Sequence, residues 1–341
     1  MRTELLGLSL LLTVSCSDSA GADRPPASAQ SASSTAATTA KPSANAASSA
    51  AERYSCPMHE DIEQYGPGKC PKCGMDLELS PLGPAVSASA GSSASATGSA
   101  AAPPGDYRIS FQNNTLTVGE RADIELTMLD PAGNKLKETD FKIAHEQRIH
   151  LLIVDASLTD YHHEHPVPAG DGTTLTFDFT PTKPGPYRVF ADVIPLATRK
   201  HRYLVEDLRG AGTGEPISRR ATSLESTVDG LAFKLTLPAE LKQGETANGQ
   251  LDIRDAKGAT LENLEPLMGA YAHIVGFSED RSTVEHIHPL GKEPTKETDR
   301  GKGALQFRLT PTKAGLLRLF AQVKVEGKER FAPFTVTVLP K

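Results

Sequence analysis

The feature that most constrains the fold of this chain is an internal repeat of β-type sequence. Residues 180–193, TPTKPGPYRVFADV, recur as residues 310–323, TPTKAGLLRLFAQV. Before each copy, at residues 174–179 and 304–309, apolar residues alternate with polar ones. Such alternation places every second side chain on one face of a β-strand. The repeat therefore predicts two copies of one β-rich domain.

The pattern of the whole C-terminal region agrees with this interpretation. From residue 106 onward, short runs rich in Thr, Val, Leu and Phe are separated by Gly, Pro and Asp turns. The segments between the runs do not show the apolar pattern of an amphipathic helix, which argues against a parallel α/β sheet. We predict a mainly β chain with two tandem antiparallel β-sandwiches of the immunoglobulin or cupredoxin kind, at 106–207 and 224–341. A polar connector at 208–223 would join them.

Two further segments, residues 17–52 and 81–105, consist almost wholly of Ala, Ser, Thr, Pro and other small residues. Such a composition cannot bury enough apolar area to offset the entropy lost on ordering. We predict that both are disordered linkers, and that the parts they join move independently.

Residues 1–16 have the pattern of a secretory signal, with an apolar run from Leu5 to Val14 that is too short to span a bilayer. The segment that ends at Cys16 resembles a bacterial lipobox, although Thr13 and Glu4 depart from the usual pattern. This resemblance implies lipidation of Cys16 and a bacterial cell-envelope protein, lipid-anchored to a membrane and periplasmic or surface-exposed. A simple secreted chain and a cytoplasmic chain are the alternatives.

Between the two low-complexity segments, residues 53–80 concentrate metal-binding side chains. CPMH at 56–59 is followed after ten residues by CPKCGM at 70–75, giving the spacing C-x2-H-x10-C-x2-C. Two knuckles of this kind can bring four ligands to one tetrahedral centre. Because the segment is short and rich in turn residues, metal would have to hold it together. The predicted donors are Cys56, His59, Cys70 and Cys73, with thioether contacts from Met58 and Met75.

The identity of the metal is less constrained than its ligands. If Cys16 carries lipid, three cysteines remain, which is a poor disulfide framework for an oxidising compartment. The alternative to metal ligation is a Cys70–Cys73 disulfide that leaves Cys56 unpaired. A Cys3His set suits Zn(II) as well as Cu(I), and the two adjacent methionines favour copper.

These residues resemble the small heavy-metal-binding module that precedes some copper-exporting P-type ATPases and the periplasmic adaptors of heavy-metal efflux pumps. The resemblance runs from about Tyr54 to Leu79 and includes Gly66-Pro67-Gly68, with Glu60 where proline is expected. It implies binding of copper or a related metal, and a partner such as an efflux pump or a metallochaperone. It does not imply that this chain is itself a pump or an adaptor.

The repeat carries a second set of candidate ligands. Three histidines of the first copy recur in the second at a constant displacement of 123 residues: His150, His163 and His165, then His273, His286 and His288. A His-x-His pair on a strand places both imidazoles on one face, about 6.5–7 Å apart, where they can share a metal. Packed structural histidines and a partner-docking edge are the alternatives. Whether the two triads converge is left open by the sequence.

The remaining features limit the function classes. A net charge of -6 and the absence of Trp and of a basic stripe argue against nucleic-acid binding. The chain has no G-x-S-x-G elbow, phosphate loop or HExxH helix, and no cysteine beyond Cys73 for a blue copper site, so we predict no enzyme. We expect an envelope-anchored protein that sequesters a heavy metal, copper in first place, and hands it to an efflux system. The alternative is a surface scaffold or adhesion protein with a purely structural zinc knuckle.

Overall fold

The structure is a computed structural model that describes residues 53–56, 62–65, 68–70, 75, 77–80, 105–218 and 220–341. The predicted signal peptide, its Cys16 and nearly all of both predicted linkers lie outside these residues. The described part is mainly β, as predicted, with one short 3-10 turn at Glu138–Asp140. Within it, no helix has the length and hydrophobicity needed to cross a membrane.

The predicted metal module contains a small antiparallel sheet that the sequence patterns did not indicate. Its strands are β1 (Arg53–Ser55), β2 (Glu63–Tyr65) and β3 (Glu78–Ser80), in the order β2-β1-β3. Each strand is three residues long. The sheet gives the ends of the module a fixed register, while the Cys-containing knuckles connect its strands.

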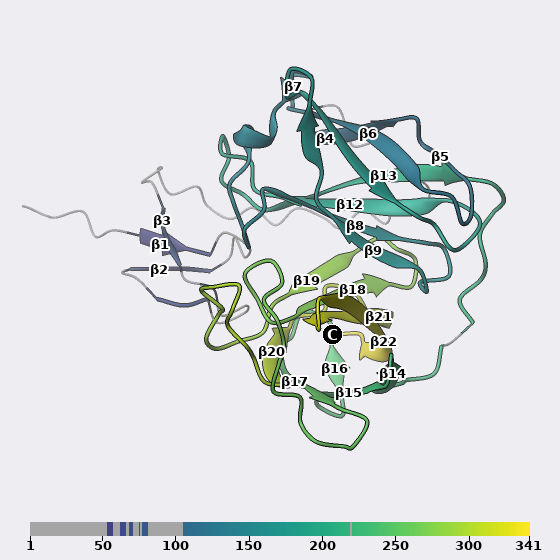
Figure 1. Ribbon diagram of the computed structural model, residues 1–341. Helices are drawn as coiled ribbons and strands as arrows, with labels where there is room; N and C mark the ends of the chain where they lie inside the picture. Colours follow the sequence, from purple (N-terminus) through teal and green to yellow (C-terminus); the bar gives the residue numbers. More distant parts are fainter. Residues whose placement is uncertain are drawn as a thin grey trace, which may run out of the picture. The chain divides into compact units, whose positions relative to one another are not determined.

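The first sandwich has two sheets. One has the order β10-β11-β6-β4 with β7 paired to β6, and the other has the order β5-β13-β12-β8-β9. Figure 1 shows β12, β8 and β9 side by side in the second of these. The strands are β4 (Arg108–Gln112), β5 (Thr115–Leu116), β6 (Ala122–Leu129), β7 (Lys135–Leu136), β8 (Ile149–Val154), β9 (Tyr161–Glu164), β10 (Val167–Ala169), β11 (Thr174–Phe179), β12 (Tyr187–Val193) and β13 (Arg202–Gly210).

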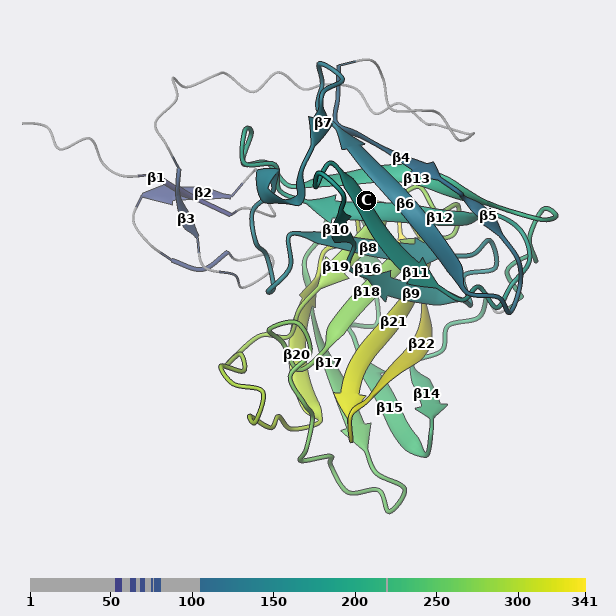
Figure 2. The same ribbon diagram turned by 45° about the horizontal axis from the view of Figure 1, so that its top comes forward.

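The second sandwich repeats most of this topology, but among the described strands it has β14 beside β15 and no counterpart of β7 or β10. Its sheets have the orders β14-β15-β17-β20 and β16-β22-β21-β18-β19, and Figure 2 shows β21 and β22 as a long hairpin. The strands are β14 (Glu225–Val228), β15 (Leu231–Thr236), β16 (Leu241–Lys242), β17 (Ala247–Arg254), β18 (His273–Ser278), β19 (Val284–Ile287), β20 (Ala304–Leu309), β21 (Gly315–Val325) and β22 (Lys328–Leu339).

Both sandwiches contain one pairing that is not antiparallel. The two-residue strands β5 and β16 pair in parallel with β13 and β22. In each copy the chain leaves one sheet at the end of β4 or β15 and joins the other sheet a few residues later. In the first copy Asn113 makes this change of direction at φ 51°, a left-handed conformation that Asn tolerates better than most residues. Every other strand pair in the described part of the chain is antiparallel.

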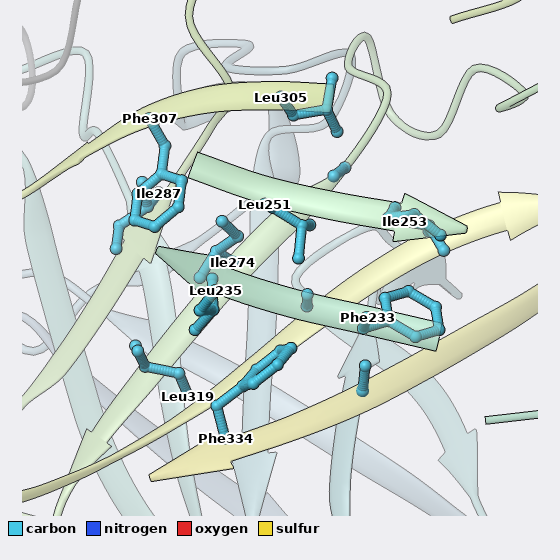
Figure 3. Close-up of a cluster of buried hydrophobic side chains, with 14 of the residues drawn as sticks. Phe233, Leu235, Leu251, Ile253, Ile274, Ile287, Leu305, Phe307, Leu319 and Phe334 are labelled. Carbon is cyan, nitrogen blue, oxygen red and sulfur yellow. The ribbon is translucent and has the colours of Figure 1, made fainter. Parts of the chain in front are cut away.

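Each sandwich has its own apolar core. In the second, the inward-facing residues of both sheets form one cluster, which includes Phe233, Leu251, Phe307 and Phe334, all almost fully buried (Figure 3). These residues come from β15, β17, β20 and β22, so the cluster joins the two sheets. The alternating pattern at 304–309 is confirmed, because Leu305, Phe307 and Leu309 are the buried members.

A third apolar cluster contains residues of both sandwiches. In β8 and β18 all six residues are buried, because both faces of each strand are covered. Leu151 and Ile153 point into the first core, whereas Leu152 and Val154 pack with Val275 and Phe277 of the second sandwich. The sheet that contains β8 and β12 in the first sandwich and the sheet that contains β18 and β21 in the second therefore share an apolar interface. The histidines lie at the margin of this interface.

Candidate metal centres

The described part of the metal module brings two of the predicted thiol ligands together. Cys56 and Cys70 are buried and belong to one small cluster with Leu77. Backbone hydrogen bonds join Cys56 N to Ile62 O (3.0 Å) and Cys70 N to Met75 O (2.7 Å). Met58, His59 and Cys73 lie outside the described residues.

The six histidines of the repeat gather at the interface between the sandwiches. In the first sandwich, His150 on β8 pairs across the sheet with Asp192 on β12, and His163 on β9 pairs with Leu152. Cross-strand partners point to the same face of a sheet. Since Leu152 faces the second sandwich, His150 and His163 face it too.

The second sandwich repeats this register. His273 on β18 pairs with Gln322 on β21, and His286 on β19 pairs with Val275, which faces the first sandwich. The third histidine of each triad, His165 or His288, comes one residue after its strand ends. The identical local register is what places the six rings on two facing surfaces.

The imidazoles approach one another at hydrogen-bond distances. His150 Nδ1 lies 3.1 Å from His163 Nε2 and 3.1 Å from His165 Nε2. In the second copy, His273 Nδ1 lies 3.2 Å from His286 Nε2. Ring nitrogens of two overlapping sets lie within 4.8 Å of one another: His150, His163 and His165, and then His163, His273 and His286. The second set takes ligand atoms from both sandwiches.

The outer nitrogens of the two strand histidines have backbone partners within their own sandwich. His150 Nε2 lies 2.9 Å from Ala144 O, and His273 Nε2 lies 2.9 Å from Leu267 O. A carbonyl oxygen accepts only, so the proton of each neutral ring is on Nε2. The inner Nδ1 atoms then carry lone pairs.

The outer nitrogens of the hairpin histidines have partners in the opposite sandwich. His163 Nδ1 lies 2.9 Å from Gln322 Oε1, and His286 Nδ1 lies 2.8 Å from Asp192 Oδ2. Gln322 Nε2 donates to Glu329 at 2.7 Å, which fixes the amide with its oxygen toward His163. In a typical metal site the second ring nitrogen of a ligating histidine carries a proton, and this N–H donates a hydrogen bond to a carbonyl or carboxylate oxygen in the same way.

A seventh imidazole, His145, completes the cluster. It stacks on His288 with ring centroids 3.5 Å apart. Within the described part of the chain, neither His145 Nε2 nor His288 Nε2 has a hydrogen-bond partner, although both atoms are buried. His145 adopts φ 50° and its counterpart Met268 adopts φ 49°, so the two copies share this turn. Met268 follows His145 by the same 123 residues that separate the two histidine triads.

The surroundings favour neutral rings. Burial, followed by the neighbouring His286, lowers the pKa of His150 to about 4 and that of His145 to about 3. The pKa of His165 falls to about 3, through burial and then His150. Burial opposes ionisation of Asp192, but His201 and His286 outweigh it and lower the pKa of this carboxyl well below its usual range. His145, His150 and His165 are therefore uncharged nitrogen donors near neutral pH, and one buried carboxylate lies beside the cluster.

Asp192, Gln322 and His201 were not singled out from the sequence. Asp192 and Gln322 occupy the same position of the repeat, between an Ala and a Val of an apolar strand. Both are buried. The sequence signal that could have found them was a polar residue in the middle of an apolar run. His201 Nε2 lies 2.7 Å from Asp192 Oδ1. His162, by contrast, faces away from the cluster and lies 3.2 Å from Asp160.

Three solved structures illustrate the similarity of this chain to known folds. The adhesin FdeC of Escherichia coli is 16% identical with a TM-score of 0.22, and the alignment covers 69% of this chain and 65% of that one. A Salmonella alpha-2-macroglobulin mutant is 12% identical with a TM-score of 0.21, over 72% of this chain and 15% of that one. Domains 4 and 5 of the S-layer protein SbsC are 12% identical with a TM-score of 0.17, over 69% and 98%. Scores this low carry no argument. The comparison with curated proteins found no match.

Two family comparisons are informative. The family described as "Heavy metal binding domain" matches residues 53–78, the segment that holds Cys56 and Cys70. A second family, described as "Domain of unknown function (DUF8832)", matches residues 101–203 and 226–339, which together are more than half of the chain and correspond to the two sandwiches. The chain therefore belongs to the DUF8832 family and carries a heavy-metal-binding domain at residues 53–78.

Proposed function

We propose that this protein is a non-enzymatic heavy-metal-binding protein of the bacterial cell envelope, which captures Cu(I) and hands it to an efflux pump or metallochaperone. Cys16 would carry the lipid anchor. Cys56, Cys70 and Cys73 would bind the ion as thiolates, with His59 as the fourth donor. Met58 and Met75 would offer thioether contacts during transfer.

The observation that supports this proposal most directly is the match of residues 53–78 to the heavy-metal-binding family. The described geometry is compatible with it, because Cys56 and Cys70 lie in one buried cluster. A segment of this length has too little apolar surface to fold without further support, and a bound metal supplies it. The metal here is cargo and structural support together.

The same four donors fit sequestration of a metal ion better than they fit catalysis. Catalytic metal sites keep one coordination position open for water or substrate, whereas structural and storage sites fill all four with protein ligands. Three thiolates and one imidazole fill a tetrahedral site. Release would then proceed by ligand exchange with the thiols of a partner.

The test is a metal titration of the full chain under anaerobic conditions. Wild-type protein is titrated with Cu(I) in competition with a chromophoric Cu(I) chelator, and bound copper and zinc are counted by mass spectrometry. We expect Cu(I) to displace zinc, and Cys70→Ser to abolish this displacement. Ser110→Ala, an exposed change on β4 of the first sandwich, serves as the control.

A different result would favour the alternative function. Retention of one zinc ion with Cu(I) refused would indicate a structural knuckle on a scaffold or adhesion protein. Unchanged tolerance of copper, silver and zinc in a deletion strain would contradict metal handling altogether. The adhesin and S-layer likenesses do not favour either outcome, because their TM-scores are too low.

A further inference from the structure

We propose that the histidine cluster between the sandwiches is a second metal centre, shared by both sandwiches, which binds a divalent ion of the Cu(II) or Zn(II) class. Its residues are His145, His150, His163, His165, His273, His286 and His288. This centre is separate from the cysteine module and does not depend on the function proposed for that module.

The first argument is the arrangement of protons. The outer nitrogens of His150 and His163 both face oxygen acceptors, Ala144 O and Gln322 Oε1. Each neutral ring has one N–H, and in both rings the outer acceptor takes it. The inner atoms, His150 Nδ1 and His163 Nε2, therefore face each other at 3.1 Å with two lone pairs. Two lone pairs at this distance repel each other, and a metal ion bound between the two nitrogens would remove that repulsion.

The second argument is distance. Imidazole nitrogens bound to one Zn(II) or Cu(II) ion at about 2.0–2.1 Å lie about 2.9–3.4 Å apart, depending on whether the geometry is square-planar or tetrahedral. The inner contacts of His150 with His163 and of His273 with His286, at 3.1 and 3.2 Å, fall in that interval. Their outer partners are already arranged as ligating histidines require.

The third argument is the origin of the donors. Among the candidate sets, one combines His163 of the first sandwich with His273 and His286 of the second. The outer nitrogens of His163 and His286 are held by Gln322 and Asp192, each from the opposite sandwich. Neither sandwich alone supplies this set or its supporting hydrogen bonds. A bound ion would therefore join the two sandwiches.

The donor chemistry selects the class of ion. All seven side chains offer imidazole, a donor of intermediate softness that suits Cu(II), Zn(II) and Ni(II) better than Mg(II) or Ca(II). Asp192 supplies negative charge next to His286 without occupying the inner space. His145 and His288, whose buried Nε2 atoms have no partner among the described residues, supply further donors. His286 and His288 also line a pocket of about 470 Å³, together with His201.

The test removes the cysteine site first. The full chain with Cys56, Cys70 and Cys73 changed to Ala is prepared without an affinity tag and titrated with Cu(II) and separately with Zn(II). Calorimetry measures affinity, and the electron paramagnetic resonance spectrum of Cu(II) reports nitrogen ligands. We expect tight binding with a spectrum of several equatorial nitrogens, and at least a tenfold loss of affinity in both His163→Gln and His273→Gln.

His162→Gln is the matched control, because His162 is the neighbour of His163 on the same strand and faces the other way. If His163→Gln fails to fold, His165→Gln replaces it, and if His273→Gln fails to fold, His288→Gln replaces it; both are changes at half-buried rings. No Cu(II) or Zn(II) binding by the cysteine-free chain would overturn the metal centre. Full affinity in His273→Gln, with loss in His163→Gln, would overturn the sharing between sandwiches. Neither outcome bears on Cu(I) binding by the cysteine module.

Discussion

His163 of the first sandwich and Gln322 of the second are joined by a 2.9 Å hydrogen bond, and His286 and Asp192 repeat this contact in the opposite direction. Asp192 and Gln322 occupy equivalent positions of the repeat, 130 residues apart. The two copies therefore support each other's hairpin histidines through the same strand position. Only the side chain at that position differs, a carboxylate in one copy and an amide in the other.

Because of this difference, Asp192 and Gln322 should affect the basicity of their histidine partners to different extents. A carboxylate that accepts a hydrogen bond from a ligating imidazole raises its basicity more than an amide does, and such partners typically change metal affinity about 10–100-fold. We predict that Asp192→Asn weakens Cu(II) binding by the cysteine-free chain by about tenfold or more, and that Gln322→Ala, which removes the weaker amide acceptor, weakens it less. Calorimetry measures both.

Asp178→Asn, a change at an exposed carboxylate on β11, is the control for altered net charge. If all three variants show the same affinity as the parent, the hydrogen bonds of Asp192 and Gln322 do not tune a metal site.

Part of this architecture could be predicted from the sequence. The repeat and the period-two patterns identified two β-sandwiches, because alternation at positions such as 304–309 directly reflects which side chains are buried. The histidines could be identified as paired candidates because the repeat contains the strands that carry them. Strand β13 nevertheless continues to Gly210, within the predicted connector, because Leu208 pairs with Tyr187 and is buried.

The convergence of the two triads could not be predicted, because it depends on how the sandwiches pack. The visible sign was that Ile149–Val154 and His273–Ser278 are almost continuously apolar rather than alternating, which indicates strands covered on both faces. Gln322 could be recognised as a partner of His163 only from the structure, since 159 residues separate them.

The apolar interface between the sandwiches should contribute strongly to stability. Phe277 is fully buried and has its ring centroid 5.5 Å from Tyr161 and 5.8 Å from Phe190, both in the other sandwich. Truncation of a buried phenylalanine leaves a cavity and typically costs about 3–5 kcal/mol. We predict a loss of this size in Phe277→Ala, measured by urea unfolding, with near-neutral behaviour of the half-exposed Val118→Ala. A loss below about 1 kcal/mol would mean that the interface contributes little.

The cysteine module should respond differently to loss of a thiol and loss of a thioether. Cys56 is buried in the cluster of the module, whereas Met75 is half-buried. We predict that Cys56→Ser lowers Cu(I) affinity by several orders of magnitude, because a thiolate ligand is lost. Met75→Leu keeps a side chain of similar volume and should mainly slow the transfer of Cu(I) to an external thiol. Competition with a chelator gives the affinity, and stopped-flow absorbance gives the transfer rate. Equal affinity in wild type and Cys56→Ser would contradict the assignment of this thiol.

A buried carboxylate of the first sandwich, that of Asp160, should control acid stability. Asp160 accepts hydrogen bonds from the Tyr187 hydroxyl and from Thr182 N (2.7 Å), and His162 Nε2 lies 3.2 Å away. Burial by itself raises the pKa of Asp160, but His162, Tyr187 and Thr182 together outweigh it and lower the pKa to about 2. The folded state thus binds this proton less tightly than the unfolded state, whose carboxyl has a pKa of about 3.9.

The sign of the effect follows from this difference. The stabilisation is fully present above about pH 4 and is lost as the pH falls toward 2, because the unfolded chain takes up the proton first. We predict that Asp160→Asn lowers the free energy of unfolding at pH 7 by about 2 kcal/mol and flattens its decline between about pH 4 and pH 2. Urea unfolding at a series of pH values measures both effects, with the exposed Asp123→Asn as control. A variant that keeps the wild-type slope in that interval would show that another carboxylate is responsible.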